Sequence, residues 1–300
     1  NQLETVPEDL GVEKVRFTDS DSYMDLVIKT TDYTEPLGID KNMPARFLLP
    51  LIDQKAASGF VNASLALDQA RAVKDIQEQE LMRKASHLND MAMAEITHFF
   101  KEGVTETDLA EQLKKIYRDL GADGLSFEPL FAFGSNAASG HHWPDDTRLK
   151  PGDCILVDIG CTWEGYCSDM TRTFFYKNVT QHQQEVYHTV LKANEEAEKA
   201  VTPGIPLSSL DQIARGIITD KGYGSAFTHR LGHFIGLEDH EFGDVSSASA
   251  DRAVPGNIFS IEPGVYLEND MGVRVEDLVL VTDHGHEILN HFSKELTVID

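Results

Sequence analysis

The chain has 300 residues, of which 41% are hydrophobic and 25% charged, a balance typical of a soluble globular protein. Its net charge of −24 argues against nucleic acid as a partner, because phosphates require clustered Lys and Arg. No apolar stretch is long enough to span a membrane as a helix, and no signal segment opens the chain. The first residue is Asn1 rather than Met, so we expect the natural protein to begin upstream.

Residues 1–70 contain few predicted elements. Met24–Thr30 resembles a strand, and the apolar run Pro44–Asp53 resembles a helix. This is too little for a complete domain, so we interpret the segment as part of an amino-terminal α/β domain. The charged stretch Arg71–Glu80 is interpreted as the linker into the rest of the chain.

Residues 71–300 show a regular order of helices and strands. Apolar residues recur every three or four positions from Leu81 to Phe99, and again from Leu109 to Leu120 after a capping pattern at Thr105 and Asp108. Strand-like sequence follows, and then the order of helix, helix and paired strands repeats. We therefore expect a pseudo-symmetric α+β domain whose sheets line a central site, with helices packed outside.

Three cysteines, Cys154, Cys161 and Cys167, lie in one short segment. Their spacing matches no zinc-binding pattern, and an odd number without a secretion signal indicates reduced thiols in a cytosolic protein. We expect them to pack in strands.

The first carboxylates that could carry chemistry lie in a predicted hairpin. If Glu164 and Gly165 form a two-residue turn, Asp158 faces Thr171 and Asp169 is a diagonal neighbour on the same face. Two unpaired carboxylates would resist burial together, and a pair of divalent cations removes that objection. The competing interpretation is that one Asp is a turn residue while the other pairs with Arg172.

Histidines and glutamates follow in two later segments. His229, His233 and His240 lie within twelve positions beside glycines, which favours one metal ligand among groups that move protons. Glu262 precedes a Pro-Gly turn, and Glu276 interrupts an apolar strand, where it needs either Arg274 or a metal as partner. Four carboxylates and one imidazole favour a hydrolytic two-metal site containing Mn²⁺, Co²⁺, Zn²⁺ or Fe²⁺.

Six motifs in this order carry a resemblance to a known family: GSNAASGHHWP, VDIG, YCSDMTRTF, HRLGHFIGLEDHE, IEPGVY and GVRVEDLVLVT. Residues 71–300 resemble the pita-bread metallopeptidases, most of all bacterial Xaa-Pro dipeptidase (prolidase) and aminopeptidase P. The resemblance implies a catalytic domain over 71–300 and a cytoplasmic homodimer. It also implies two divalent metal ions, with Mn²⁺ preferred. His142 stands where the family usually has an aromatic residue.

The resemblance also assigns residue roles. It implies metal ligation by Asp158, Asp169, His233, Glu262 and Glu276, with Asp169 and Glu276 bridging the two ions. Glu262 is in addition the expected general base. His229 and His240 are expected to contact the substrate or the tetrahedral intermediate, and His141 to lie at the mouth of the site. Arg274 is expected to support Glu276, and Arg252 is a candidate cation for the carboxylate of proline.

These roles predict hydrolysis of the Xaa-Pro amide bond in dipeptides by a metal-bridged hydroxide. The main alternative is an aminopeptidase P, which removes the first residue from longer Xaa-Pro peptides. Methionine aminopeptidase is disfavoured because the upstream segment resembles the extra domain of the other subfamily. A non-catalytic, protein-binding member of the fold, or a metal-independent hydrolase of creatine type, would not need all five ligand positions.

Overall fold

The computed structural model describes residue 11 and residues 14–300. The chain separates into two compact units, Asn1–Leu67 and Asp68–Asp300. The described elements of the first unit are α1 (Tyr23–Lys29), β1 (Pro36–Ile39), α2 (Ala45–Asp53) and β2 (Gly59–Asn62), and α3 (Ser64–Ala72) runs across the boundary. The two strands pair in parallel, and α2 corresponds to the predicted helix.

The strand predicted for Met24–Thr30 is wrong, because this segment forms helix α1. The Ser22 hydroxyl accepts a hydrogen bond from the Asp25 backbone N–H and so caps the first turn. Only Met24 in this helix is buried. A short helix that is mostly exposed has few apolar positions, and their spacing can resemble that of a strand.

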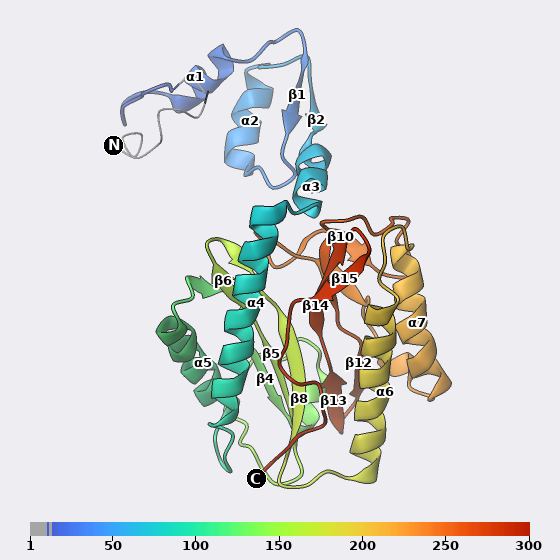
Figure 1. Ribbon diagram of the computed structural model, residues 1–300. Helices are drawn as coiled ribbons and strands as arrows, with labels where there is room; N and C mark the ends of the chain where they lie inside the picture. Colours follow the sequence, from blue (N-terminus) through green and yellow to red (C-terminus); the bar gives the residue numbers. More distant parts are fainter. Residues whose placement is uncertain (1–10, 12–13) are drawn as a thin grey trace. The chain divides into compact units, whose positions relative to one another are not determined.

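The second unit contains two helix pairs, each followed by strands (Figure 1). The first round comprises α4 (Ile76–Thr97), α5 (Glu106–Leu120), β3 (Gly124–Leu125), β4 (Leu130–Phe133), η2 (Gly134–Ala138), β5 (Cys154–Ile159), β6 (Cys161–Trp163), β7 (Tyr166–Cys167) and β8 (Met170–Tyr176). The second comprises α6 (Gln181–Lys199), α7 (Leu207–Asp220), η3 (Gly224–Ala226), β9 (Gly232–Phe234), β10 (Glu241–Val245), β11 (Ile258–Ile261), β12 (Gly264–Leu267), β13 (Met271–Arg274), β14 (Asp277–Thr282), β15 (Gly285–Ile288) and β16 (Val298–Ile299).

Two sheets carry most of these strands. One has the order β16-β8-β5-β4, and the other has the order β10-β9-β11-β14-β15. Smaller sheets are formed by β12-β13 and by β3-β6-β7. The repeated helix, helix and strand order in the sequence thus corresponds to two helix pairs with a sheet each, and the predicted pita-bread α+β fold is confirmed.

The predicted hairpin register is also confirmed. Trp163 pairs with Tyr166, and Asp158 pairs with Thr171 on the neighbouring strand. Glu164 and Gly165 both have positive φ, 47° and 85°, as a tight two-residue hairpin turn requires.

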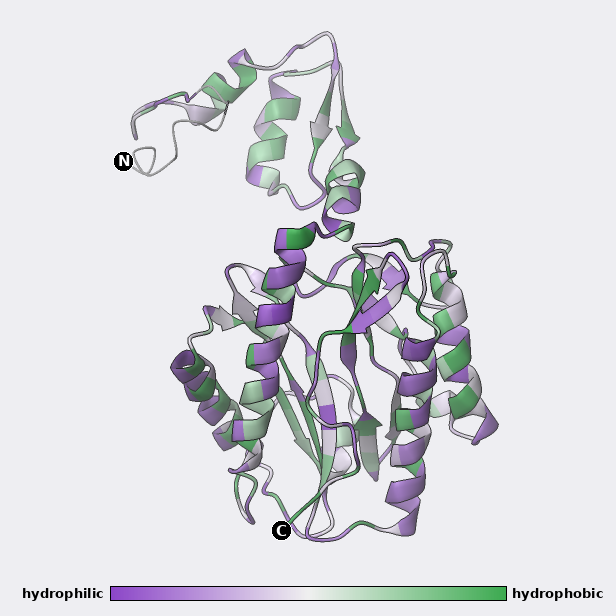
Figure 2. Ribbon diagram, viewed as in Figure 1, coloured by the Kyte–Doolittle hydropathy of each residue, from purple (hydrophilic) through white to green (hydrophobic). Residues whose placement is uncertain are grey.

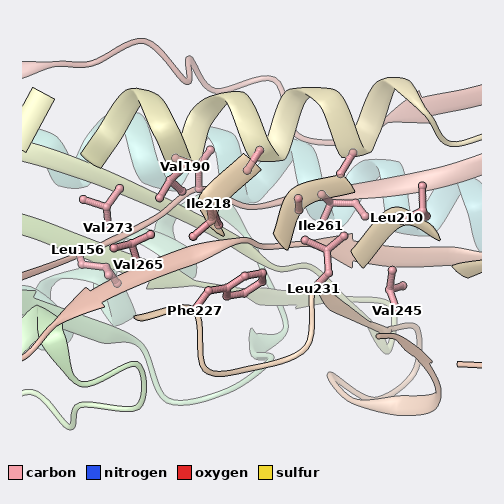
Figure 3. Close-up of a cluster of buried hydrophobic side chains, with 14 of the residues drawn as sticks. Leu156, Val190, Leu210, Ile218, Phe227, Leu231, Val245, Ile261, Val265 and Val273 are labelled. Atoms are coloured by element: carbon pink, nitrogen blue, oxygen red, sulfur yellow. The ribbon is translucent and has the colours of Figure 1, made fainter. Parts of the chain in front are cut away.

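The helices cover the sheets from outside. In Figure 1 the strands of the second unit lie between the α4–α5 pair and the α6–α7 pair. Figure 2 shows many hydrophilic residues along α4 and α6, and both hydrophobic and hydrophilic stretches on the strands between them. Val190 of α6 and Leu210 of α7 belong to one core cluster of buried side chains, which also contains Ile261 and Val273 from the strands (Figure 3). A second cluster joins α4 and α5 to β4, β5 and β8.

The connection between α3 and α4 is shorter than the predicted linker Arg71–Glu80. Helix α3 ends at Ala72 and α4 begins at Ile76, because Asp75 and Glu78 form a capping box that starts the helix there.

None of the described helices has the length and apolar character needed to cross a membrane. All three cysteines are buried and free, and burial raises the pKa of the Cys154 thiol to about 12.

Candidate metal centre

One cavity of about 770 Å³ collects the predicted site residues in the second unit. Its lining includes all five predicted ligands, the three predicted histidines and one of the two predicted arginines: Asp158, Asp169, His233, Glu262, Glu276, His141, His229, His240 and Arg274. Arg252 is not among the lining residues. Its guanidinium donates to the Gly204 carbonyl oxygen at 2.7 Å, and its side chain is exposed.

The hairpin brings the first two carboxylates to the cavity. Asp158 lies on β5, and Asp169 immediately precedes β8. Each has one buried carboxylate oxygen, Oδ1, without a hydrogen-bond partner in the structure. Burial raises the pKa of Asp169 well above its ordinary value, and the charges of Glu276 and Asp158 add to this effect. Arg172 does not pair with either Asp. Its guanidinium binds Asp277 at 2.6 Å, which removes the competing interpretation of the hairpin.

Glu276 reaches the cavity because the apolar run around it is not one strand. The run breaks into β13 and β14, which belong to different sheets, and Glu276 lies in the break. The Thr171 hydroxyl donates to Glu276 Oε2 at 2.7 Å, while Oε1 is buried without a partner. Possible ligand atoms of Asp169, His233 and Glu276 lie within 4.8 Å of one another.

His233 and Glu262 complete the donor set. His233 Nε2 lies 3.5 Å from Asp169 Oδ2 and 3.5 Å from Glu262 Oε1. Burial and the neighbouring His240 lower the pKa of His233 to about 3, so the imidazole is neutral and has a lone pair to offer. Burial raises the pKa of Glu262 to about 7, although Arg274 opposes that shift.

These residues fit divalent cations. Asp158, Asp169 and Glu276 each have a buried oxygen without a partner in the same cavity. Burial raises the pKa values of Asp169 and Glu276 well above their ordinary range, as expected for carboxylates that lack compensating charge. A set of four carboxylates and one neutral imidazole suits Mn²⁺, Co²⁺, Zn²⁺ or Fe²⁺.

Arg274 contacts Asp158 directly and Glu276 through Thr171. Its Nη2 donates to Asp158 Oδ2 at 2.6 Å, and its Nε donates to the Thr171 hydroxyl at 3.0 Å. Because Thr171 in turn donates to Glu276, the support for Glu276 passes through a threonine. Arg274 also donates to the Tyr266 hydroxyl at 2.7 Å.

The histidines occupy distinct positions around the donor set. His229 Nε2 lies 2.9 Å from the Tyr266 hydroxyl, and burial lowers the pKa of His229 to about 4. The His240 ring packs edge-on against His233, with 4.0 Å between centroids, and its side chain is 60% exposed. His141 lines both this cavity and a smaller neighbouring groove. His142 points elsewhere, with Nε2 2.7 Å from the buried Glu106 carboxylate.

Sequence reasoning missed four polar residues of the cavity: Thr228, Arg230, Asp239 and Tyr266. Asp239 stands between Glu238 and His240 in a segment with three acidic residues. The sequence does not indicate which of the three side chains points into the cavity. In the structure Glu238 is exposed and Glu241 is paired with Lys74 and Arg71, whereas Asp239 faces the cavity.

Comparisons with known proteins agree with this geometry. The sequence profile of Metallopeptidase family M24 matches residues 80–283. An uncharacterized peptidase of Staphylococcus aureus strain MW2 is 41% identical over 244 residues, which are 81% of this chain and 70% of that protein. The crystal structure of a recombinant prolidase from Thermococcus sibiricus superposes with a TM-score of 0.93 at 33% identity, covering 99% of this chain and 82% of the other.

An X-Pro aminopeptidase from Thermotoga maritima is also similar, with a TM-score of 0.87 at 31% identity, covering 95% of this chain and 82% of that one. The resemblance inferred from the sequence motifs is therefore confirmed. Members of this family depend on divalent metals, which agrees with the donor set in the cavity. The fold, the profile match and the sequence identity together show that this chain belongs to Metallopeptidase family M24.

Proposed function

We propose that this chain is a dinuclear metallopeptidase that hydrolyses the amide bond before proline in dipeptides. The observation that carries the proposal is the donor set in one cavity, where four carboxylates surround a neutral imidazole. Similarity to a prolidase supports the choice of substrate. A non-catalytic member of the fold would have no need to keep buried carboxylate oxygens without hydrogen-bond partners.

Asp158, Asp169, His233, Glu262 and Glu276 would hold two divalent ions, with Mn²⁺ as the preferred metal. When bound, such ions polarise the scissile carbonyl and lower the pKa of a water molecule. Thr171 fixes the orientation of the Glu276 carboxylate through its 2.7 Å hydrogen bond, and Arg274 fixes that of Asp158. Such contacts commonly change metal affinity or activity by about 10–100-fold.

Glu262 is the proposed general base. Its Oε1 lies 3.5 Å from His233 within the donor set, where a carboxylate can accept a proton from water and return it. The departing proline nitrogen has no N–H of its own, so it must be protonated before it leaves, and Glu262 would deliver that proton. His229 or His240 would stabilise the negative charge that develops on the carbonyl oxygen.

Arg230 is the better placed cation for a free proline carboxylate. It lines the cavity and pairs with Asp244 at its partly exposed edge, whereas Arg252 is engaged by the Gly204 carbonyl. A substrate carboxylate would replace Asp244 as the partner of Arg230. A dipeptide offers that carboxylate next to proline, and a tripeptide does not.

The test compares Ala-Pro and Leu-Pro with their glycine-extended tripeptides, using protein stripped of metal and then loaded with Mn²⁺ or Co²⁺. We expect no turnover without metal and a higher kcat/KM for the dipeptides. Full activity of metal-free protein, verified by elemental analysis, would refute a metallopeptidase. Tripeptides cleaved as well as dipeptides would indicate an aminopeptidase P, the second candidate, which is favoured by the similarity to the Thermotoga enzyme.

Two matched arginine variants locate the carboxylate contact. We expect Arg230→Gln to lower kcat/KM on Ala-Pro by roughly tenfold or more, with little change on Ala-Pro-Gly, because one charge-assisted hydrogen bond is lost. Arg252→Gln should leave both values unchanged. The opposite pattern would assign the carboxylate to Arg252.

A further inference from the structure

A group of titratable side chains outside the metal cavity gathers around Glu106, the first residue of α5. The Glu106 side chain has no exposed surface. Its Oε1 accepts the Phe133 backbone N–H at 2.8 Å and the Asn136 side-chain amide at 3.0 Å. Its Oε2 accepts the Asp145 backbone N–H at 3.1 Å and lies 2.7 Å from His142 Nε2. One buried carboxylate thus joins the end of β4, η2 and the loop that follows η2.

The four donors saturate the Glu106 carboxylate. An ionised carboxylate has about four lone pairs and can only accept, so His142 Nε2 carries the hydrogen that it shares with Glu106. Burial raises the pKa of Glu106, and the hydrogen bonds from the four donors oppose that shift. Ligand atoms of Glu106, His142 and Asp145 lie within 4.8 Å of one another, but the saturated carboxylate has no lone pair left for a metal ion. The contact between Glu106 and His142 is therefore a charge-assisted hydrogen bond.

His141, the neighbour of His142 in the chain, lines the metal cavity. Its side chain is exposed, and within the described residues no hydrogen bond holds its ring. The place of this imidazole in the cavity therefore depends on the backbone that carries it. On one side that backbone packs against the cavity wall, because the Gly140 carbonyl accepts from Arg274 Nη1 at 3.3 Å. A Cβ on Gly140 would lie only 3.3 Å from Tyr266 Cζ.

On the other side of His141, the side chain of His142 anchors the backbone. The His142 backbone N–H donates to the Ser139 carbonyl at 3.2 Å, which closes a turn around Gly140 and His141. The imidazole of His142 binds Glu106, so this turn is tied to the start of α5. In the part of the chain that the structure describes, the next two residues after His142 form no hydrogen bond. The His142 side chain is thus the tie nearest to His141 on this side.

We propose that the hydrogen bond between Glu106 and His142 positions the imidazole of His141 in the metal cavity. His142 is then a positioning residue that acts through the backbone it shares with His141. This inference rests on the proposed function, in that His141 would contact the bound peptide. A displacement of about 1 Å in such a contact can cost about 10²-fold in rate, so loss of the tie should be visible in turnover.

The test compares wild-type protein with His142→Phe, His142→Gln and Asp145→Asn, each loaded with Mn²⁺ and checked for metal content by elemental analysis. Phe keeps a ring and removes the donor, whereas Gln keeps an N–H donor. Asp145→Asn is the matched control, because this 54% exposed acid has its Oδ2 4.0 Å from His142 Nε2. Asn also keeps the Oδ1 acceptor for the Thr147 N–H. His141→Ala, alone and combined with His142→Phe, shows whether His142 acts through His141.

We expect His142→Phe to lower kcat/KM on Ala-Pro by roughly ten- to a hundredfold with normal metal content, and His142→Gln to keep most of the activity. Asp145→Asn should match wild-type protein. In the His141→Ala background, His142→Phe should cause no further loss, because the effects of residues that act as one unit do not add. Additive losses, equal losses for Phe and Gln, or loss of metal would overturn the proposal. So would His141→Ala protein with wild-type activity.

Trp143 provides a readout that needs neither metal nor substrate. The chain has two tryptophans, so Trp163→Phe leaves Trp143, next to His142, as the single fluorophore. In that background we expect the fluorescence anisotropy to decay faster for His142→Phe than for the parent protein or His142→Gln. If the protein cleaves a peptide other than Ala-Pro, the kinetic comparison is made with that peptide. If it cleaves none, the proposed function fails and the anisotropy decides. Equal decays in all three proteins would then refute the positioning role.

Discussion

At the residue scale, replacing a cavity carboxylate by its amide should have a different effect at each position, because the carboxylates have different proposed roles. Asp169 and Glu276 each have a buried oxygen without a partner, so their proposed contribution is negative charge for the metals. Glu262 accepts a hydrogen bond from Ser260 at 3.2 Å and combines proposed ligation with proton transfer. The three positions should therefore respond differently to loss of charge.

We predict that Asp169→Asn and Glu276→Gln lose most of their metal, whereas Glu262→Gln retains more metal and loses more activity for each metal bound. General base catalysis is typically worth about 10²–10⁴-fold, which sets the expected fall in kcat. Elemental analysis and kcat, measured on the same preparations, separate the two effects. Asp169→Asn protein with full metal content and a normal rate would contradict the assignment.

The residue scale also shows where sequence reasoning succeeds and where it stops. The pairing of Asp158 with Thr171 follows from the two-residue turn at Glu164 and Gly165, because a hairpin fixes every opposite pair along its strands. The inward turn of Asp239 and the outward position of Arg252 depend on loop conformation, which no periodicity encodes.

At the element scale, a buried ion pair joins the segment between α3 and α4 to the start of β10. Lys74, between α3 and α4, has a side chain only 1% exposed and binds Glu241 at the start of β10. Arg71 binds the other oxygen of the same carboxylate at 2.7 Å. The backbone of the Lys74 segment is tied in as well, because the Lys74 N–H donates to the Gly256 carbonyl at 2.8 Å.

Removing Lys74 should therefore destabilise the second unit and loosen the turn that carries His240. We predict that Lys74→Met lowers the free energy of unfolding by about 1–3 kcal/mol, because Glu241 Oε2 loses its buried partner while Arg71 still binds Oε1. Urea denaturation measures this loss. The double variant Lys74→Met/Glu241→Gln is the control and should recover part of the lost stability. An effect of Lys74→Met below about 0.5 kcal/mol, the range of ordinary surface substitutions, would contradict the prediction.

Element boundaries were predictable where a local signal marks them. The capping box at Thr105 and Asp108 and the left-handed Gly121 delimit α5 as the sequence indicates. The break between β13 and β14 has no comparable signal, because its apolar residues suit a single strand equally well. Membership of two different sheets decides that break, and this tertiary feature is what brings Glu276 to the cavity.

At the scale of the whole molecule, the two halves of the second unit contribute carboxylates that repel one another at the shared cavity. Asp158 and Asp169 come from the first sheet and its hairpin, while Glu262 and Glu276 come from the second half. Burial raises the pKa values of Asp169, Glu262 and Glu276, so folding without metal favours proton binding by these three groups. Burial raises the pKa of Asp239 to about 7 as well, so it joins the same set.

The stability of the metal-free protein should consequently fall as pH rises. Carboxyl groups with raised folded-state pKa values bind more protons when folded than when unfolded, and stability then decreases with pH until the folded pKa is passed. His233 and His229 have lowered pKa values, about 3 and 4, so they act in the opposite direction, but only up to their unfolded pKa of roughly 6.5. Glu262 and Asp239, both with pKa values of about 7, continue to titrate above it.

We therefore predict that the Tm of metal-free protein decreases between about pH 6.5 and 8, and that Mn²⁺ raises Tm most at the alkaline end, where protons no longer compete for the ligands. Calorimetric scans with and without Mn²⁺ across this range test both signs. Asp169→Asn is the matched control: without one of the buried charges, its metal-free Tm should depend less on pH and respond less to Mn²⁺. A metal-free Tm that rises with pH would contradict the prediction. So would a Mn²⁺ effect on Tm that is the same at both ends of the pH range, because it would show that protons and Mn²⁺ do not compete for these carboxylates.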